Sequence, residues 1–236
     1  MAPSQRVTTA NISLVPEPSL DDLLAGELLL HTDADGQPVS WQLGADVLRV
    51  LDETVGDTSR TLETGEGLST ILFALRRAHH TCVTPNAAAI ARIRSACEHA
   101  DIALDTVDFI VGNSESVLPG LELPPLDVVL IDGRHGFPAP FIDYYYTADV
   151  VKVGGLLIVD DTQLWTGRVL REFLESEPEW RMAWDFAPRS AIFAKTQPGG
   201  RDKEWNEQPY VVSHPGVAEP QVEKPPPKGL RRLMHR

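Results

Sequence analysis

The sequence has few cysteines, no long apolar run and no excess of positive charge. Two cysteines in 236 residues give no disulfide framework, so a reducing cytoplasm is the expected location. No apolar stretch approaches the roughly 20 residues that a membrane-spanning helix needs, so we expect no stable membrane insertion. The first residues also lack the apolar segment of a secretory signal. The formal net charge of −13 argues against nucleic acid as a partner, because phosphates attract positive charge.

The composition is that of a soluble globular protein with appendages. Apolar residues make up 42% and charged residues 23% of the chain, and its length suits one substantial core. We expect three parts: a lead with short helices over 1–60, a core over 61–195, and a flexible tail over 196–236 that is rich in proline. The short helices, within 19–57, are expected to close over a cleft in the core.

Short apolar runs alternate with helical patterns between residues 61 and 195. A short, largely apolar run such as LDVVLI (126–131) is typical of a strand buried on both faces of a parallel sheet. This alternation predicts a doubly wound, Rossmann-like α/β sheet, and the last two runs predict an antiparallel pair. The seven expected strands lie near 60–63, 79–84, 107–111, 126–131, 155–159, 180–186 and 190–195; the main helices lie near 68–78, 86–100, 140–151 and 164–174.

The first strand end carries the pattern ETGEGLST (63–70). Ligands of such sheets bind at the carboxyl ends of strands, and Gly65 and Gly67 allow a tight turn and the close approach of a ligand. Glu63 would repel a pyrophosphate on this loop, and the third glycine of dinucleotide-binding loops is replaced by Thr70. The loop therefore argues against a nicotinamide dehydrogenase and favours a ligand with a positive charge or an amino group.

Acidic residues also follow the fourth and fifth strands. Asp132 ends one strand, with His135 three residues later, and Asp160 and Asp161 end the next. If these strands are neighbours, three carboxylates gather at one edge and must protonate or bind a cation. A hard ion such as Mg²⁺ fits oxygen ligands, and a histidine with a pKa near neutrality suits a general base. The structural alternative is that the aspartates cap a helix or a turn and His135 is a surface loop residue.

The motifs together resemble those of class I S-adenosylmethionine-dependent methyltransferases. LETGEGLST (62–70) resembles their first motif, GNSESVLP (112–119) their third-strand motif, and 126–161 their fourth and fifth motifs. The resemblance implies S-adenosylmethionine as cofactor. It places Glu63, Gly65 and Gly67 around the methionine part of the cofactor, with Ser69 at the helix start.

The same resemblance assigns the remaining cofactor residues. Asn113 and Ser114 would face the adenine, and Asp132 would lie at the edge of the cofactor cleft. The second strand of the family normally ends in an acid that binds the ribose hydroxyls, whereas this sequence has Thr84 there, followed by Asn86. Thr84 can make one hydrogen bond but no bidentate carboxylate contact, so the sequence leaves the ribose without its usual partner.

Within the family, the pattern is most similar to bacterial metal-dependent O-methyltransferases that act on macrolide sugars. Asp132, Asp160 and Asp161 would bind the metal and His135 would be the base. The expected reaction is methylation of a hydroxyl of a small metabolite. Two alternatives stay open: a metal-independent methyltransferase acting on an amine or a carboxyl group, and a degenerate, non-catalytic binding module. The oligomeric state also stays open, a homo-oligomer included.

Overall fold

The computed structural model describes residues 18–26, 28–33 and 35–214. The expectations for the first 17 residues, and for the tail beyond residue 214, lie outside the described residues. The described part contains the predicted seven-stranded sheet, with strands in the order β5-β4-β3-β6-β7-β9-β8. The strands are β3 (Arg60–Thr64), β4 (His79–Thr84), β5 (Val107–Val111), β6 (Leu126–Ile131), β7 (Val151–Val159), β8 (Trp180–Phe186) and β9 (Ser190–Lys195).

The sheet is mixed, as the sequence predicts. Neighbours among β3 to β7 pair in parallel, whereas β9 runs antiparallel to both β7 and β8. Because β6 and β7 are parallel neighbours, their carboxyl ends lie side by side, which confirms the expected adjacency of the fourth and fifth strands. The structure therefore has the predicted Rossmann-like α/β architecture.

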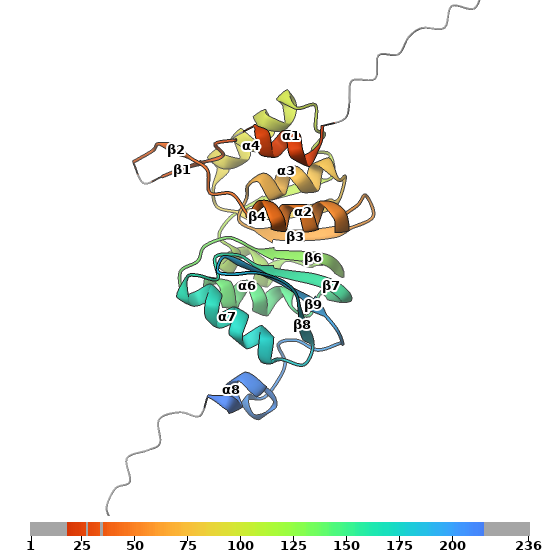
Figure 1. Cartoon of the computed structure of the whole chain (residues 1–236), viewed down its shortest axis with the longest axis vertical. Helices are drawn as coiled ribbons and strands as arrows, with labels where there is room; N and C mark the ends of the chain where they lie inside the picture. Colours follow the sequence, from red (N-terminus) through yellow and green to blue (C-terminus); the bar gives the residue numbers. More distant parts are fainter. Residues whose placement is uncertain (1–17, 27, 34, 215–236) are drawn as a thin grey trace, which may run out of the picture.

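Helices cover both faces of the sheet (Figure 1). In β6, Val128 and Leu130 pack into one hydrophobic cluster, while Val129 and Ile131 pack into the other, because successive side chains of a strand point to opposite faces. The helices are α1 (Leu20–Ala25), α2 (Ala45–Thr54), α3 (Leu68–Leu75), α4 (Ala87–His99), α5 (Ser114–Val117), α6 (Ala139–Thr147), α7 (Trp165–Ser176) and α8 (Pro209–Ser213). The first four contribute to one cluster, and α6 and α7 contribute to the other.

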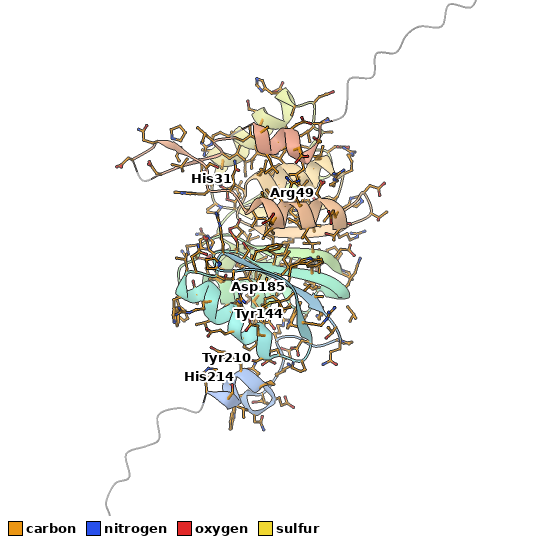
Figure 2. The ribbon with its side chains drawn as sticks, viewed as in Figure 1. His31, Arg49, Tyr144, Asp185, Tyr210 and His214 are labelled. Atoms are coloured by element: carbon orange, nitrogen blue, oxygen red, sulfur yellow. The ribbon has the colours of Figure 1, made fainter. Side chains whose placement is uncertain are left out.

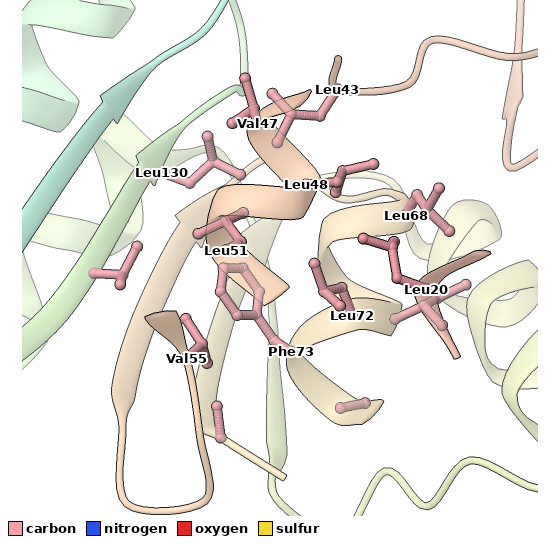
Figure 3. Packing of buried hydrophobic residues seen from close by; sticks show 14 of the residues in the cluster. Leu20, Leu43, Val47, Leu48, Leu51, Val55, Leu68, Leu72, Phe73 and Leu130 are labelled. Atoms are coloured by element: carbon pink, nitrogen blue, oxygen red, sulfur yellow. The ribbon is translucent and has the colours of Figure 1, made fainter. Parts of the chain in front are cut away.

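The two N-terminal helices belong to the core and do not close over the cleft. Ser19 caps α1 as predicted, accepting from the backbone of Asp22. In α2, Leu48 and Leu51 are fully buried and pack in one cluster with Phe73 of α3 (Figure 3). No residue of α1 or α2 lines the cavity at the strand ends. The small hairpin of β1 (His31–Thr32) and β2 (Pro38–Val39) lies between these helices in the chain.

Two boundaries differ from the sequence-based expectation. The helix expected over 140–151 ends at Thr147, and β7 begins at Val151, because Val151 already pairs with Leu126 of β6; the register then shifts before Leu156 pairs with Val128. The tail expected to be flexible from residue 196 contains η2 (Trp205–Glu207) and α8 in its described part.

The described tail is held to the sheet domain by charge and by aromatic packing. The Lys203 ammonium lies 2.6 Å from carboxylate oxygens of both Glu177 and Glu179, which are buried. The Tyr210 ring lies 5.8 Å from that of Phe173 on α7, and Figure 2 shows Tyr210 beside the end of the domain. These contacts join distant parts of the chain, so local periodicity did not reveal them. Among the described helices, none has the length and apolar character needed to span a membrane.

Candidate functional site

The carboxyl ends of four parallel strands form a continuous edge. Backbone hydrogen bonds continue past the strand ends, from Gly65 to Val83, from Asp132 to Thr64, and from Asp160 to Ile131. Beside this edge lies a cavity of about 730 Å³, within the range of small-molecule sites. Eight of the predicted site residues line it: Gly65, Thr84, Asn113, Ser114, Asp132, His135, Asp160 and Asp161.

Gly65 is required by backbone packing at this edge. Its φ of +94° lies in the left-handed region, and a Cβ atom there would collide with the carbonyl group of Asp132. The loop after β3 therefore lies directly against the loop after β6. The sequence assigned Gly65 to ligand approach; the structure shows that it also fixes the position of Asp132. Gly67 has no such constraint, since a Cβ there would meet only the His31 ring at 3.6 Å.

Glu63 and Ser69 are buried and do not line the cavity. Ser69 Oγ donates to Glu63 Oε2 at 2.6 Å, and the Thr70 hydroxyl donates to Oε1. His80 Nε2 lies 3.1 Å from the same oxygen, and its Nδ1 lies 2.8 Å from Thr61 Oγ1. This buried network satisfies the Glu63 carboxylate and ties β3 to α3 and β4. Glu63 thus holds the start of α3, directly after the glycine loop, through its hydrogen bonds with Ser69 and Thr70.

A different carboxylate occupies the end of β4. Glu66, between the two glycines, accepts a hydrogen bond from Thr84 Oγ1 at 2.5 Å and one from Asn86 Nδ2 at 3.1 Å. Glu66 lines the cavity with both residues. Its side chain is only 8% exposed, and burial raises the pKa of its carboxyl. Glu66 is not recognisable from the sequence as a cavity residue, because nothing local indicates that its side chain turns toward β4.

Asp132, His135 and Asp161 form an acidic cluster with one imidazole. His135 Nε2 lies 3.0 Å from Asp161 Oδ2 and 3.9 Å from Asp132 Oδ1. One potential metal-ligand atom from each residue lies within 4.8 Å of the others. All three side chains are partly exposed to the cavity, so a bound ligand can reach them. The structure therefore brings together the predicted base and two of the three predicted metal ligands.

Asp160 has a different environment from its neighbour. It is buried and accepts a hydrogen bond from the Ser190 hydroxyl. Arg189 Nε, from the β8–β9 turn, lies 3.9 Å from an oxygen of Asp160 and 3.9 Å from one of Asp161. Asp160 therefore lines the cavity but lies outside the three-residue cluster. The guanidinium was not expected from the sequence, since only the return of β9 beside β7 places it there.

The carboxyls differ in their affinity for protons. Burial, reinforced by the charges of Asp160, Glu63 and Asp161, raises the pKa of Asp132 well above its usual value. Burial likewise raises the pKa of Asp160, with Asp161 adding to the effect. The hydrogen bond with His135 lowers the pKa of Asp161. Asp161 is thus the carboxylate that stays ionised, whereas Asp132 favours a proton or a cation in its place.

Polar and aromatic side chains surround the cavity. His31 Nε2 lies 2.9 Å from the backbone oxygen of Glu66, and its ring lies 5.8 Å from that of Trp41; Figure 2 shows His31 at the base of the N-terminal hairpin. Arg134 pairs with Glu115 at 3.0 Å, joining the loop after β6 to α5. His31 and Trp41 therefore line the site, whereas no residue of α1 or α2 does.

Comparisons with known proteins agree with this architecture. Residues 62–162 match a protein family described as "Methyltransferase domain". The chain is similar in structure to the O-methyltransferase TomG from Streptomyces achromogenes, involved in tomaymycin synthesis, in complex with SAM (18% identity, TM-score 0.58, 78% of this chain and 93% of that chain). It is also similar to an O-methyltransferase from Bacillus cereus in complex with SAH (19%, 0.52, 78% and 94%). The fold is that of a Rossmann-like methyltransferase.

The structural neighbours do not share one substrate class. An rRNA methylase from Streptococcus thermophilus is similar as well, with 13% identity and a TM-score of 0.50 over 67% of this chain and all of that chain. Curated protein sequences yield no match. The comparisons therefore establish the methyltransferase fold, and the choice of acceptor must come from the cavity itself.

Proposed function

We propose that the protein transfers the methyl group of S-adenosylmethionine to a hydroxyl of a small molecule. The observation that carries this proposal is the His135–Asp161 pair, 3.0 Å apart, on the edge of a cavity formed by methyltransferase-type strand ends. The family match over 62–162 and the SAM- and SAH-bound neighbours support the cofactor. The net charge of −13 favours a small acceptor over RNA, whose phosphates it would repel.

In this reaction, His135 is the general base. A proton on Nε2 satisfies the Asp161 carboxylate and leaves Nδ1 as the unprotonated ring atom. The acceptor hydroxyl gives its proton to this ring, and the oxygen attacks the methyl carbon as the sulfonium C–S bond breaks. The products are a methyl ether, S-adenosylhomocysteine and a protonated imidazole. Asp161 stabilises the imidazolium, as a carboxylate does in other histidine pairs.

A divalent cation is the proposed partner of Asp132 and Asp161. One potential ligand atom from each of Asp132, His135 and Asp161 lies within 4.8 Å of the others, and the carboxylate oxygens suit a hard ion such as Mg²⁺. When bound, such an ion supplies a lower pKa for a coordinated hydroxyl. His135 Nε2 lies 3.0 Å from Asp161 Oδ2 and 3.9 Å from Asp132 Oδ1, so the base lies beside the residues that would hold the ion.

A metal-independent reaction is the second candidate, and Arg189 is the observation that favours it. Its guanidinium lies 3.9 Å from both Asp160 and Asp161, so part of the acidic charge already has a partner. In that case the acids orient the acceptor, which includes an amine or a carboxyl group, and His135 keeps its hydrogen bond to Asp161.

Calorimetric titration with S-adenosylhomocysteine, with and without Mg²⁺, tests the cofactor and the metal together. We expect micromolar binding and, with hydroxylated acceptors, a methylated product that chelation abolishes and Mg²⁺ restores. Activity that is insensitive to chelation would select the metal-independent candidate. Absence of binding under all conditions would overturn methyl transfer as the function and leave the non-catalytic module.

A further inference from the structure

The end of β4 presents a carboxylate although its own sequence provides none. The strand finishes at Thr84, and the helix that follows is capped by Asn86. The carboxylate comes from Glu66, which lies between two glycines in the loop after the neighbouring strand β3. Its side chain crosses to β4 and lies against both polar residues.

The carboxylate of Glu66 is fixed in place and still has free acceptor capacity. Oε2 accepts from Thr84 and Oε1 accepts from Asn86, and His31 Nε2 lies 3.9 Å from Oε1. Each oxygen thus has one hydrogen-bond donor and can accept from a second. The loop backbone is held as well, because the Glu66 carbonyl oxygen lies 2.9 Å from His31 Nε2. A carboxylate with both oxygens held and one acceptor position free on each is suited to two adjacent hydroxyl donors.

We propose that Glu66 binds the vicinal hydroxyls of a ribose in this cavity, with Thr84 and Asn86 as positioning residues. The inference rests on the proposed function, since the ribose is that of the adenosyl cofactor. A vicinal diol offers two O–H groups at the spacing of the two carboxylate oxygens. Charged hydrogen bonds of this kind are stronger than those that the Thr84 hydroxyl alone would make. The carboxylate that binds the ribose therefore comes from the glycine loop after β3, whereas in the family it normally comes from the end of the second strand.

Binding of S-adenosylhomocysteine and of its 2′-deoxy analogue to Glu66→Gln tests the assignment. The amide replaces one acceptor oxygen by a donor at nearly constant size. We expect Glu66→Gln to bind S-adenosylhomocysteine about 10- to 100-fold more weakly than the unchanged protein, the usual effect of losing a hydrogen bond to a charged group. Glu98→Gln, an exposed position on α4, is the matched control and should bind normally.

The deoxy analogue separates a ribose contact from a general disturbance of the cavity. The unchanged protein should bind the analogue about 10-fold or more weakly than the full ligand, and Glu66→Gln should largely lose this discrimination. Equal discrimination by both proteins, or an unchanged affinity of Glu66→Gln, would overturn the role of Glu66 while leaving the proposed function intact. Failure of the unchanged protein to bind S-adenosylhomocysteine would overturn the proposed function itself, and this inference with it.

A second variant keeps the test decisive if Glu66→Gln does not fold. Thr84→Val removes the hydroxyl that holds Oε2 and keeps the side-chain shape. We expect it to weaken binding of the full ligand more than binding of the deoxy analogue. An equal loss for both ligands, with normal folding by circular dichroism, would contradict the assignment.

Discussion

His135 Nε2 lies 3.0 Å from Asp161 Oδ2, and the two residues come from the ends of neighbouring parallel strands. The pairing of β6 with β7 sets this relationship. It gives the imidazole a fixed hydrogen-bond partner at the rim of the cavity. The hydrogen bond within this pair lowers the pKa of Asp161, whereas burial raises the pKa values of Asp132 and Asp160.

Replacing the base, His135, should strongly slow methyl transfer and leave the affinity for the cofactor nearly unchanged. His135→Gln should lower kcat by about 10²- to 10⁴-fold, the usual contribution of a general base, and leave S-adenosylhomocysteine affinity within a few-fold. Single-turnover methyl transfer and calorimetry measure the two effects. His99→Gln, exposed on α4, is the control. Unchanged turnover in His135→Gln would remove His135 from the mechanism.

Asp161→Asn tests the partner of the base with little disturbance of the backbone. Asp161 has φ +53°, a conformation that asparagine tolerates, so the change mainly removes the charge. We expect kcat to fall by roughly 10- to 100-fold and the acidic limb of the pH–rate profile to move to lower pH, because the imidazolium of the base loses its counter-charge. A bound divalent ion should also lose affinity. If rate, pH profile and ion affinity all stay unchanged, Asp161 is only structural.

Asp132 should make the protein less stable as pH rises. Its pKa is raised in the folded state, so between the unfolded and folded pKa values only the folded protein keeps the proton. Stability is therefore greatest at low pH for this group and falls with rising pH, by about 1.4 kcal/mol for each tenfold difference in proton affinity. Asp132→Asn should be less sensitive to pH and more stable at pH 8 in the presence of a chelator. Denaturant unfolding at pH 5 and pH 8 measures this; an Asp132→Asn protein that loses stability at pH 8 would contradict it.

The contact between the glycine loop and Asp132 should not tolerate a side chain. Gly65→Ala places a Cβ atom against the carbonyl group of Asp132 at a positive φ, so the loop or the strand end must shift. We expect a loss of roughly 1–3 kcal/mol of stability together with weaker S-adenosylhomocysteine binding. In Gly56→Ala, where the added atom meets nothing within 4 Å, both should be preserved. Thermal unfolding and calorimetry of the two variants make the comparison.

The ion pairs of Lys203 should make residues 196–214 part of the cooperative fold. Lys203→Met leaves the buried carboxylates of Glu177 and Glu179 without their cation, which typically costs about 3–5 kcal/mol. Arg168→Met, at an exposed helix pair with Glu172, should cost about 1 kcal/mol or less. Similar unfolding midpoints for the two variants would show that the segment adds nothing to the stability of the fold.

The fold is predictable from two local patterns in the sequence, which are short apolar runs and the Pro and Gly positions between them. Short, largely apolar runs such as 126–131 predict buried strands, and the Pro and Gly positions between the runs mark their ends. Once the alternation is recognised, the parallel order brings Asp132 beside Asp160 and Asp161. The cluster was therefore predictable from the sequence before any distance was known.

The architecture and the acidic strand ends are predictable from the sequence, but the contacts of each loop side chain follow from the tertiary structure. Glu63 turns into the interior toward His80, and Glu66, three residues later, reaches across to Thr84. Arg189 joins the cluster only because β9 returns beside β7. The pattern of apolar residues that marks a strand is local, so it can be recognised in the sequence. The direction of a loop side chain depends on partners that are far along the chain, and packing alone brings them together.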